Sequence, residues 1–309
     1  MERKDRIDLA GAGLLVSTAL LMGINQVMIK MVNAGMQPVF QVGLRSACAI
    51  VPILLFALLA KRTLSLRDGS LLPGILCGLF FAAEFMLLFQ ALELTTVSRA
   101  SIMFYTMPFW LTLAAHFLIP GERLNVWKVL GLLIAIAGIA VAFYDPSEAV
   151  TSDVLRGDLM CIAGALLWGG IPLLTRTTRL SNSSPEMQML YMVGVSALVV
   201  LPAAPLFGPL MREMTPILWL IFAAQVLLVV SSGFLVWFWL LKRYPASQVA
   251  SFSFLSPLFG VFFGWLILGE EISVWILLAL AMVSAGIVLV NRPPRRDAPR
   301  RSSWLTDPI

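Results

Sequence analysis

The chain has 309 residues, of which 59% are hydrophobic and only 13% are charged, and its mean hydropathy is +0.90. A soluble domain is usually about half apolar and about a quarter charged, so this composition excludes an ordinary soluble protein and indicates a polytopic membrane protein. The formal net charge of +5 does not indicate a nucleic-acid partner, because most basic residues stand at the ends of apolar runs, where they orient the chain in a bilayer.

Charged residues and prolines divide the chain into runs of the length that a membrane helix requires, about 20 apolar residues. We expect an all-α polytopic membrane protein with ten transmembrane helices. In chain order these span residues 8–29, 38–59, 70–92, 97–118, 126–143, 158–176, 186–204, 216–241, 246–268 and 274–290. The connections between them are short, apart from residues 144–157.

The basic residues predict the orientation of these helices. If the first segment, MERKDRID, is cytoplasmic, most of the 22 Lys and Arg residues fall in cytoplasmic segments, as the positive-inside rule requires. An error in the number of spans would destroy this alternation. We therefore expect a multi-pass protein of the cell (inner) membrane whose N- and C-termini are both cytoplasmic.

The fourth and ninth runs repeat one phrase: MPFWLTLAAHFLIPGERL begins at Met107 and SPLFGVFFGWLILGEEI begins at Ser256. Each copy has a proline, a mostly apolar stretch and then Gly-Glu. The offset between the copies is 149 residues before the fourth run ends and 148 residues after it. The matched pairs are Ser98 with Ser247, Pro108 with Pro257, Glu122 with Glu270, Trp127 with Trp275, Gly138 with Gly286 and, less closely, Lys30 with Arg176.

This duplication predicts a 5+5 inverted repeat. Each half holds five spans, and because five is odd, the second half enters the membrane from the opposite side. In such folds the substrate site usually lies near the midplane between the repeats, and access alternates between the two sides. The predicted segments are a first repeat at 1–143, a periplasmic loop at 144–157, a second repeat at 158–290 and a basic cytoplasmic tail at 291–309.

With these motifs the chain resembles the drug/metabolite transporter superfamily, in its EamA-like ten-helix branch. The resemblance rests on the doubled proline and Gly-Glu phrase and on FQVGLRSACAI, where one arginine stands among apolar residues. The first run departs from the family, because MGINQ at 22–26 lacks the aromatic residues that LLWGGIP at 166–172 partly keeps. The resemblance implies a secondary transporter, commonly an exporter of amino acids or related small metabolites.

Two charged residues inside the apolar runs are the first site candidates. Glu84 stands in the middle of the third run, and Arg45 stands in the outer part of the second run. Buried charges in a bilayer are costly, so they are functional candidates by default. We expect Glu84 to couple transport to protons or to bind an amine. Arg45 is its natural partner, either as a structural ion pair or as a group that opens to a substrate carboxylate.

Polar and aromatic residues complete the candidate site. The amides of Asn25, Gln26 and Gln90 can bind a substrate or a neighbouring helix. Tyr105, Trp168 and Tyr191 lie in spans that the resembled family uses for its central cavity, and aromatic side chains suit an apolar or amphipathic substrate. Ordinary helix packing is the alternative for each of these residues.

Further residues have more modest expected roles. Pro108 and Pro257 stand mid-run and predict kinks that could serve as hinges or only shape the cavity. His116, the single histidine, lacks a counterpart in the second copy and is expected to be an interfacial anchor. Glu122 and Glu270 are expected to cap helices or turns.

A transporter is the leading functional hypothesis, and a membrane-embedded enzyme, a channel and a drug or quaternary-amine exporter of the same fold are the alternatives. The sequence has no zincin, nucleophile-elbow or Walker motif, so we expect no catalytic residue, no metal site and no cofactor. The expected partners are a small-molecule substrate and the lipid bilayer, with protons as an open option and no nucleic acid. Both a monomer and a homodimer are compatible with the sequence.

Overall fold

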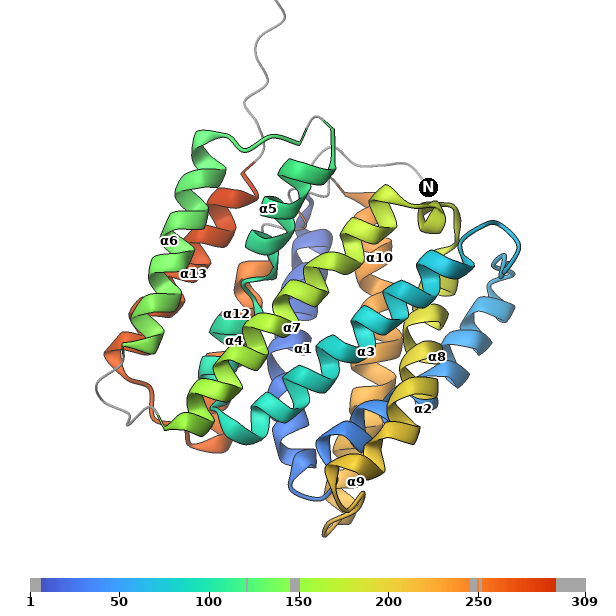
Figure 1. Ribbon diagram of the computed structural model, residues 1–309, viewed down its shortest axis with the longest axis horizontal. Helices are drawn as coiled ribbons and strands as arrows, with labels where there is room; N and C mark the ends of the chain where they lie inside the picture. Colours follow the sequence, from blue (N-terminus) through green and yellow to red (C-terminus); the bar gives the residue numbers. More distant parts are fainter. Residues whose placement is uncertain (1–6, 121, 145–150, 245–248, 250–251, 293–309) are drawn as a thin grey trace, which may run out of the picture.

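The computed structural model describes residues 7–120, 122–144, 151–244, 249 and 252–292 (Figure 1). Two predicted segments fall partly outside this range. Residues 145–150 of the predicted loop at 144–157 are not described, and the predicted tail at 291–309 is described only at Asn291 and Arg292. Ser247, the predicted counterpart of Ser98, also lies outside the described residues.

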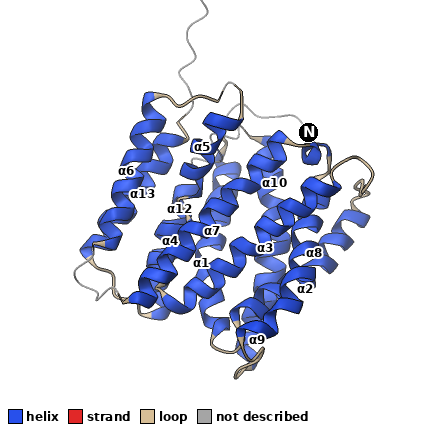
Figure 2. Ribbon diagram, in the orientation of Figure 1, coloured by secondary structure: helices blue, strands red, loops and turns tan. Residues whose placement is uncertain are grey.

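The described chain is helical, and its β-type pairing is a single isolated bridge between Met36 and Met211 (Figure 2). The α-helices are α1 (Leu9–Asn33), α2 (Pro38–Leu59), α3 (Leu71–Leu94), α4 (Val97–Phe104), α5 (Met107–Leu118), α6 (Val126–Phe143), α7 (Ser152–Thr177), α8 (Pro185–Ala203), α9 (Pro216–Ala224), α10 (Phe234–Arg243), α12 (Leu255–Leu268) and α13 (Val274–Val290). A π-helix, η3 (Gln225–Gly233), joins α9 to α10, and short 3-10 turns lie at η1 (Arg179–Asn182), η2 (Ala204–Phe207) and η4 (Phe252–Phe254).

Membrane-spanning length is reached by eight helical segments among the described residues. Two shorter apolar helical segments are described: Phe252–Leu268 lies within the predicted ninth run at 246–268, and Val274–Val290 matches the tenth. The structure therefore bears out an all-α protein with several membrane-length helices. The count of ten spans in two inverted halves stays a prediction.

The largest difference from the predicted boundaries is at α7, which begins at Ser152 and not at residue 158. Thr151 caps this helix, because its hydroxyl accepts the N–H of Val154 at 3.3 Å, and Asp153 in the first turn complements the helix dipole. An apolar run marks where a helix crosses hydrocarbon. The polar first turn of α7 was therefore assigned to the loop.

The predicted fourth run is divided in the structure, and the described part of the matching ninth run begins with a 3-10 turn. Tyr105 and Thr106 separate α4 from α5, and the 3-10 turn η4 precedes α12. The predicted mid-helix kinks at the prolines are wrong in position, since Pro108 lies in the first turn of α5 and Pro257 in the first turn of α12. First-turn N–H groups have no intrahelical acceptor, so a proline there starts a helix and does not bend it.

Small residues bring α6 and α13 together along one side of the bundle, at the left in Figure 1. A side chain added to Gly131 would meet the carbonyl of Gly286, and one added to Gly138 would lie close to the carbonyl of Ala279. The repeat offset of 148 carries Gly131 onto Ala279 and Gly138 onto Gly286. The two contacts are thus the same contact made twice, once from each half.

The remaining helices pack across the two predicted halves. The closest associations join α1 to α12, α3 to α7 and α2 to α8, and α7 also lies against α5. We call the end of the bundle with the start of α1 and the end of α2 the terminal face. The opposite end, where α1 ends and α2 begins, is the distal face.

Candidate functional site

Arg45 is a buried cation on α2 with only 1% of its surface exposed. Its guanidinium carbon lies 4.4 Å from the ring centroid of Phe85 and 4.6 Å from that of Phe89, both on α3. These distances are within cation–π range. None of its three side-chain nitrogens has a hydrogen-bond partner among the described residues. The rings therefore contact the cation, while its N–H groups lack an acceptor.

Glu84 is the matching buried anion on α3, with 2% of its surface exposed. It interacts electrostatically with Arg45, yet the predicted direct ion pair is absent from the described contacts, and Oε2 has no hydrogen-bond partner there. The helix geometry explains why the two side chains do not form a direct ion pair. Adjacent residues of a helix point about 100° apart, so a guanidinium lying over the ring of Phe85 is displaced from the carboxylate of Glu84.

Amide side chains from α1, α2 and η3 contribute further buried polar atoms. The Nε2 of Gln41 donates to the Oε1 of Gln225 at 3.3 Å, and the Oε1 of Gln26 accepts the hydroxyl of Ser101 at 2.7 Å. The other amide atoms Asn25 Oδ1, Gln26 Nε2, Gln41 Oε1 and Gln225 Nε2 lack partners among the described residues. Gln225 begins the π-helix, a feature often found at functional sites.

Aromatic rings gather where α4 gives way to α5. The rings of Phe104 and Trp168 stack at 4.9 Å, and Tyr105 meets Trp168 edge-on at 5.8 Å. Tyr105 and Trp168 are thus brought together from the two predicted halves. The sequence pointed to both residues but not to Phe104, because a phenylalanine in an apolar run carries no distinguishing signal.

Two other predicted site residues, Tyr191 and Gln90, make local hydrogen bonds. Tyr191 shares a hydrogen bond of 3.1 Å with Ser70 at the terminal end of α3 and packs over Gly74. Gln90 donates within its own helix to the carbonyl of Met86 at 3.0 Å. Both have contacts that account for them as packing residues.

A buried ion pair that the sequence did not predict joins α4 to α7. The guanidinium of Arg99 donates from Nε and Nη2 to Oδ2 of Asp158, at 3.0 and 2.5 Å, and neither side chain is exposed. The hydroxyl of Thr95 donates to Oδ1 of the same carboxylate at 2.8 Å. Both charges stand at ends of apolar runs, where charges are ordinary. Only their shared place on the distal face could have signalled the pair.

Two further ion pairs are related by the repeat. Lys30 Nζ lies 3.7 Å from Glu270 Oε1 at the distal face, and Arg176 pairs with Glu122 at the terminal face. Lys30 is matched with Arg176, and Glu122 with Glu270, in the duplicated sequence. We call these the distal pair and the terminal pair. Each joins a residue of one predicted half to a residue of the other.

The two pairs differ in how tightly they are enclosed. The Glu270 side chain is 8% exposed and accepts from the N–H of Val97, from the N–H of Ser98 and from the hydroxyl of Ser98, at 2.6, 2.9 and 2.8 Å. It caps α4, in agreement with its expected role. Glu122 is 33% exposed, and the segment that it would cap by symmetry, around residue 246, lies outside the described residues.

His116 contributes to the loop beside the terminal pair. Its Nδ1 accepts the backbone N–H of Leu124 at 3.3 Å. This contact fits the expected role as an anchor near the helix end.

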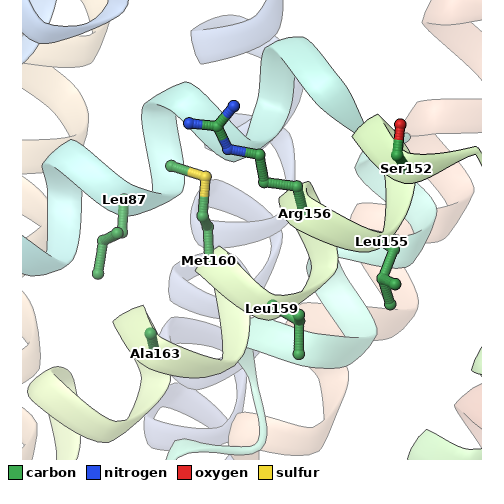
Figure 3. A pocket seen from close by; sticks show the side chains of 7 residues that line it. All are labelled: Leu87, Ser152, Leu155, Arg156, Leu159, Met160 and Ala163. Atoms are coloured by element: carbon green, nitrogen blue, oxygen red, sulfur yellow. The ribbon is translucent and has the colours of Figure 1, made fainter.

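A pocket of about 370 Å³ lies on the outside of the bundle, between α3 and α7 (Figure 3). Its lining is mostly apolar, with Leu155 and Leu159 on α7 and Leu87 on α3, and Arg156 stands at its edge. Leu155 and Leu159 are exposed on the bundle surface, as expected for side chains that meet lipid. None of the predicted site residues lines this pocket.

A model of the EamA-like transporter family matches the chain twice, at residues 9–144 and 155–292. The chain belongs to the EamA-like transporter family. It is therefore a multi-pass membrane protein of a transporter family. The resemblance seen in the doubled phrase is confirmed.

Relatives of this EamA-like chain have transporter names. It is 27% identical to "Uncharacterized transporter YoaV" of Bacillus subtilis (strain 168), over 89% of this chain and 94% of that protein. It is 26% identical to a "Probable amino-acid metabolite efflux pump" of Escherichia coli (strain K12), over 94% of this chain and 95% of that protein. A protein of Salmonella typhimurium with the same name is 27% identical over the same shares.

A solved crystal structure has the same overall fold as the EamA-like chain. The two superpose with a TM-score of 0.65, covering 91% of this chain and 96% of the other, at 21% identity. At this identity the likeness shows the fold alone.

Proposed function

We propose that this EamA-like chain is a secondary transporter that exports amino acids or related small metabolites across the cell (inner) membrane by alternating access. Both termini are proposed to be cytoplasmic, and the transporting unit is a monomer or a homodimer. The observation that carries this proposal is the duplicated ion pair. The distal and terminal pairs link the same positions of the two halves at opposite faces.

Alternating access needs two equivalent closures of which one opens at a time. Here Glu270 of the distal pair is buried and caps α4, whereas both side chains of the terminal pair are more exposed than their distal counterparts. The interruption at Tyr105–Thr106 and the 3-10 turn η4 before Leu255 are the proposed places where the parts of a span rotate. Pro108 and Pro257 lie in the first turns of α5 and α12, directly after these places. Their proposed hinge role is to fix where the helix restarts.

The proposed substrate class rests on the relatives' names and on the side chains of the site. The buried amides, Arg45 and Glu84 suit a small polar solute, and the cluster of Tyr105 and Trp168 suits an apolar portion of it. A quaternary-amine exporter of the same fold is the alternative, since Glu84 and aromatic rings would attract a lone cation. Arg45 opposes it, because a buried cation beside the site repels a second one.

Glu84 is the proposed proton-coupling group. A buried carboxylate without a hydrogen-bonded counter-ion is unstable as an anion, and a proton is the smallest ligand that neutralises it. If one proton exchanges for one solute, a gradient of about one pH unit sustains about a tenfold solute gradient. We expect Glu84→Gln to abolish this accumulation while leaving downhill exchange. Uptake of L-alanine, L-leucine and L-phenylalanine into proteoliposomes, with and without a pH gradient, measures it.

The control for this experiment is Glu93→Gln, which removes a partly exposed carboxylate from the end of the same helix. It should keep the response to the pH gradient. An undiminished response in Glu84→Gln would exclude the coupling role. Wild-type transport of quaternary amines but of none of the three amino acids would favour the alternative function.

A further inference from the structure

We propose that Arg45 and Glu84 bind the two charged groups of a zwitterion, the carboxylate of an α-amino acid at Arg45 and its ammonium group at Glu84. This inference rests on the proposed function and names the chemistry of its substrate. It differs from a structural ion pair, in which each residue would satisfy the other directly.

Arg45 is prepared to receive an anion. The rings of Phe85 and Phe89 lie near its guanidinium carbon, whereas arginine donates to carboxylates through N–H groups in the plane of the guanidinium. All three nitrogens are buried and lack an acceptor among the described residues. Leaving such donors unsatisfied costs free energy, and a bidentate carboxylate would satisfy two of them at once.

Glu84 is prepared to receive a cation in the same way. Its carboxylate is buried on α3, and Oε2 has no donor among the described residues. It interacts electrostatically with Arg45 but makes no direct ion pair with it in the described contacts. In the proposed complex, a short group that carries both charges lies between the two side chains and pairs with each.

The net charge of the ligand decides between ligand classes. A carboxylate alone would pair with Arg45 and leave Glu84 facing an added negative charge, and a lone amine would do the reverse. A zwitterion neutralises both groups, and burying two satisfied pairs costs much less than burying one unpaired charge. An α-amino acid carries both charged groups on its α-carbon, so neighbouring helices can contact both.

The surroundings add a polar side and an apolar side. Gln41 stands one helical turn before Arg45 on the same face of α2 and leads to Gln225 on η3. On α3 the rings of Phe81, Phe85 and Phe89 form a row of edge-to-face contacts. The ring row favours an amino acid with an apolar side chain.

The test compares L-leucine with two analogues that each lack one charge: L-leucinamide, without the carboxylate, and N-acetyl-L-leucine, without the ammonium group. Binding to the purified full-length protein is measured by ligand-induced thermal stabilisation. The wild type should bind L-leucine about tenfold or more tightly than either analogue, the ratio expected for a lost charge-assisted hydrogen bond. Arg45→Gln should lose only the preference over leucinamide, and Glu84→Gln only the preference over N-acetyl-leucine.

Two further variants keep the result interpretable. Arg45→Lys retains the charge but not the planar N–H groups, and should keep part of the preference over leucinamide. Glu93→Gln should bind all three compounds as the wild type does. Equal wild-type affinity for the three compounds, or loss of both preferences together in Arg45→Gln, would overturn the inference. Transport is measured separately in proteoliposomes, so selective binding without transport would overturn the proposed function and leave the zwitterion site standing.

Discussion

Arg45 and Arg99 are both buried cations, and they differ in what surrounds them. Arg99 donates to Asp158, whose second oxygen accepts from Thr95, so most of the polar atoms are satisfied. Arg45 lies against phenylalanine rings and lacks an acceptor among the described residues. A hydrogen-bonded ion pair joins two helices, whereas a buried cation without an acceptor has N–H groups that a ligand could accept from. The residue with the poorer contacts is therefore the better site candidate.

Asp158→Asn tests the structural role of the buried pair. The change leaves the charge of Arg99 buried without its counter-ion, and we expect a loss of about 3–5 kcal/mol in the free energy of unfolding. Replacing both residues, with Arg99→Met and Asp158→Leu, should cost less because no buried charge remains. Denaturant titration in detergent micelles measures both variants.

The comparison for this prediction is Glu93→Gln, which breaks a pair with Arg212 whose side chains are 43% and 31% exposed. Exposed pairs contribute about 0–1 kcal/mol. Similar losses in Glu93→Gln and Asp158→Asn would show that burial does not set the strength of the ion pair between Arg99 and Asp158.

At the scale of the element, α6 and α13 are held by shape. α13 has no charged residue and α6 has one, Lys128 in its first turn, while the backbones approach closely at Gly131 and Gly138. Lipid removes the hydrophobic drive between helices, so close packing of small residues carries the association. The contact joins helices that stand at corresponding positions of the duplicated sequence.

Gly131→Ala tests this packing. The added methyl group would lie 2.8 Å from a side-chain atom of Val290 and 2.9 Å from the carbonyl of Gly286, so the helices must separate. We expect a loss of about 1–3 kcal/mol in the free energy of unfolding, measured in detergent micelles. Gly194→Ala on α8 meets nothing within 4 Å and should be neutral or stabilising by up to about 1 kcal/mol. Equal effects of the two changes would contradict the packing role.

At the scale of the whole molecule, the distal and terminal pairs place one motif at both faces of the membrane domain. The distal pair is the more enclosed, with Glu270 8% exposed against 33% for Glu122. In a two-state transporter, weakening one closure shifts the population toward the state in which that face is open. The two glutamates should therefore have opposite effects on access from a given side.

Glu270→Gln and Glu122→Gln test this opposition with one reporter cysteine, Ala100→Cys on α4, after Ser replaces the native cysteines. Ala100 is fully buried near the distal face. Glu270→Gln should speed its labelling by a membrane-impermeant maleimide, by about tenfold for each 1.4 kcal/mol of closure lost. Glu122→Gln should slow it, because a weakened terminal pair favours the state closed at the distal face. Faster labelling in both variants would contradict alternating closure.

Much of the architecture was predictable from the chain alone. A bilayer cannot satisfy free backbone groups, so long apolar runs must form helices, and their places follow from composition. The doubled phrase predicted corresponding residues that the structure then places in equivalent contacts, such as Gly138 and Gly286. The helix ends were less predictable. The polar first turn of α7 depends on the cap by Thr151, which apolar runs do not record. The break at Tyr105 and Thr106 lies inside an apolar run, so hydropathy does not mark it either.

The sequence predicted candidate site residues, but it did not predict their contacts. The sequence indicated Arg45 and Glu84 because charges inside apolar runs are rare. The family resemblance predicted that Tyr105 and Trp168 line the same cavity. The sequence missed that Arg45 lies on phenylalanine rings, and it missed the pair of Arg99 and Asp158. Those outcomes depend on how each helix is rotated about its own axis.

By itself, then, the sequence determined the membrane environment, the helical class and the duplication, since each is a property of composition or order along the chain. Only the tertiary structure decided which buried charges are satisfied. Arg99 and Asp158 are 59 residues apart, and Glu270 meets α4 across 172 or more residues. Contacts over such separations are set by helix rotation and packing, and a side chain a single position away points about 100° elsewhere.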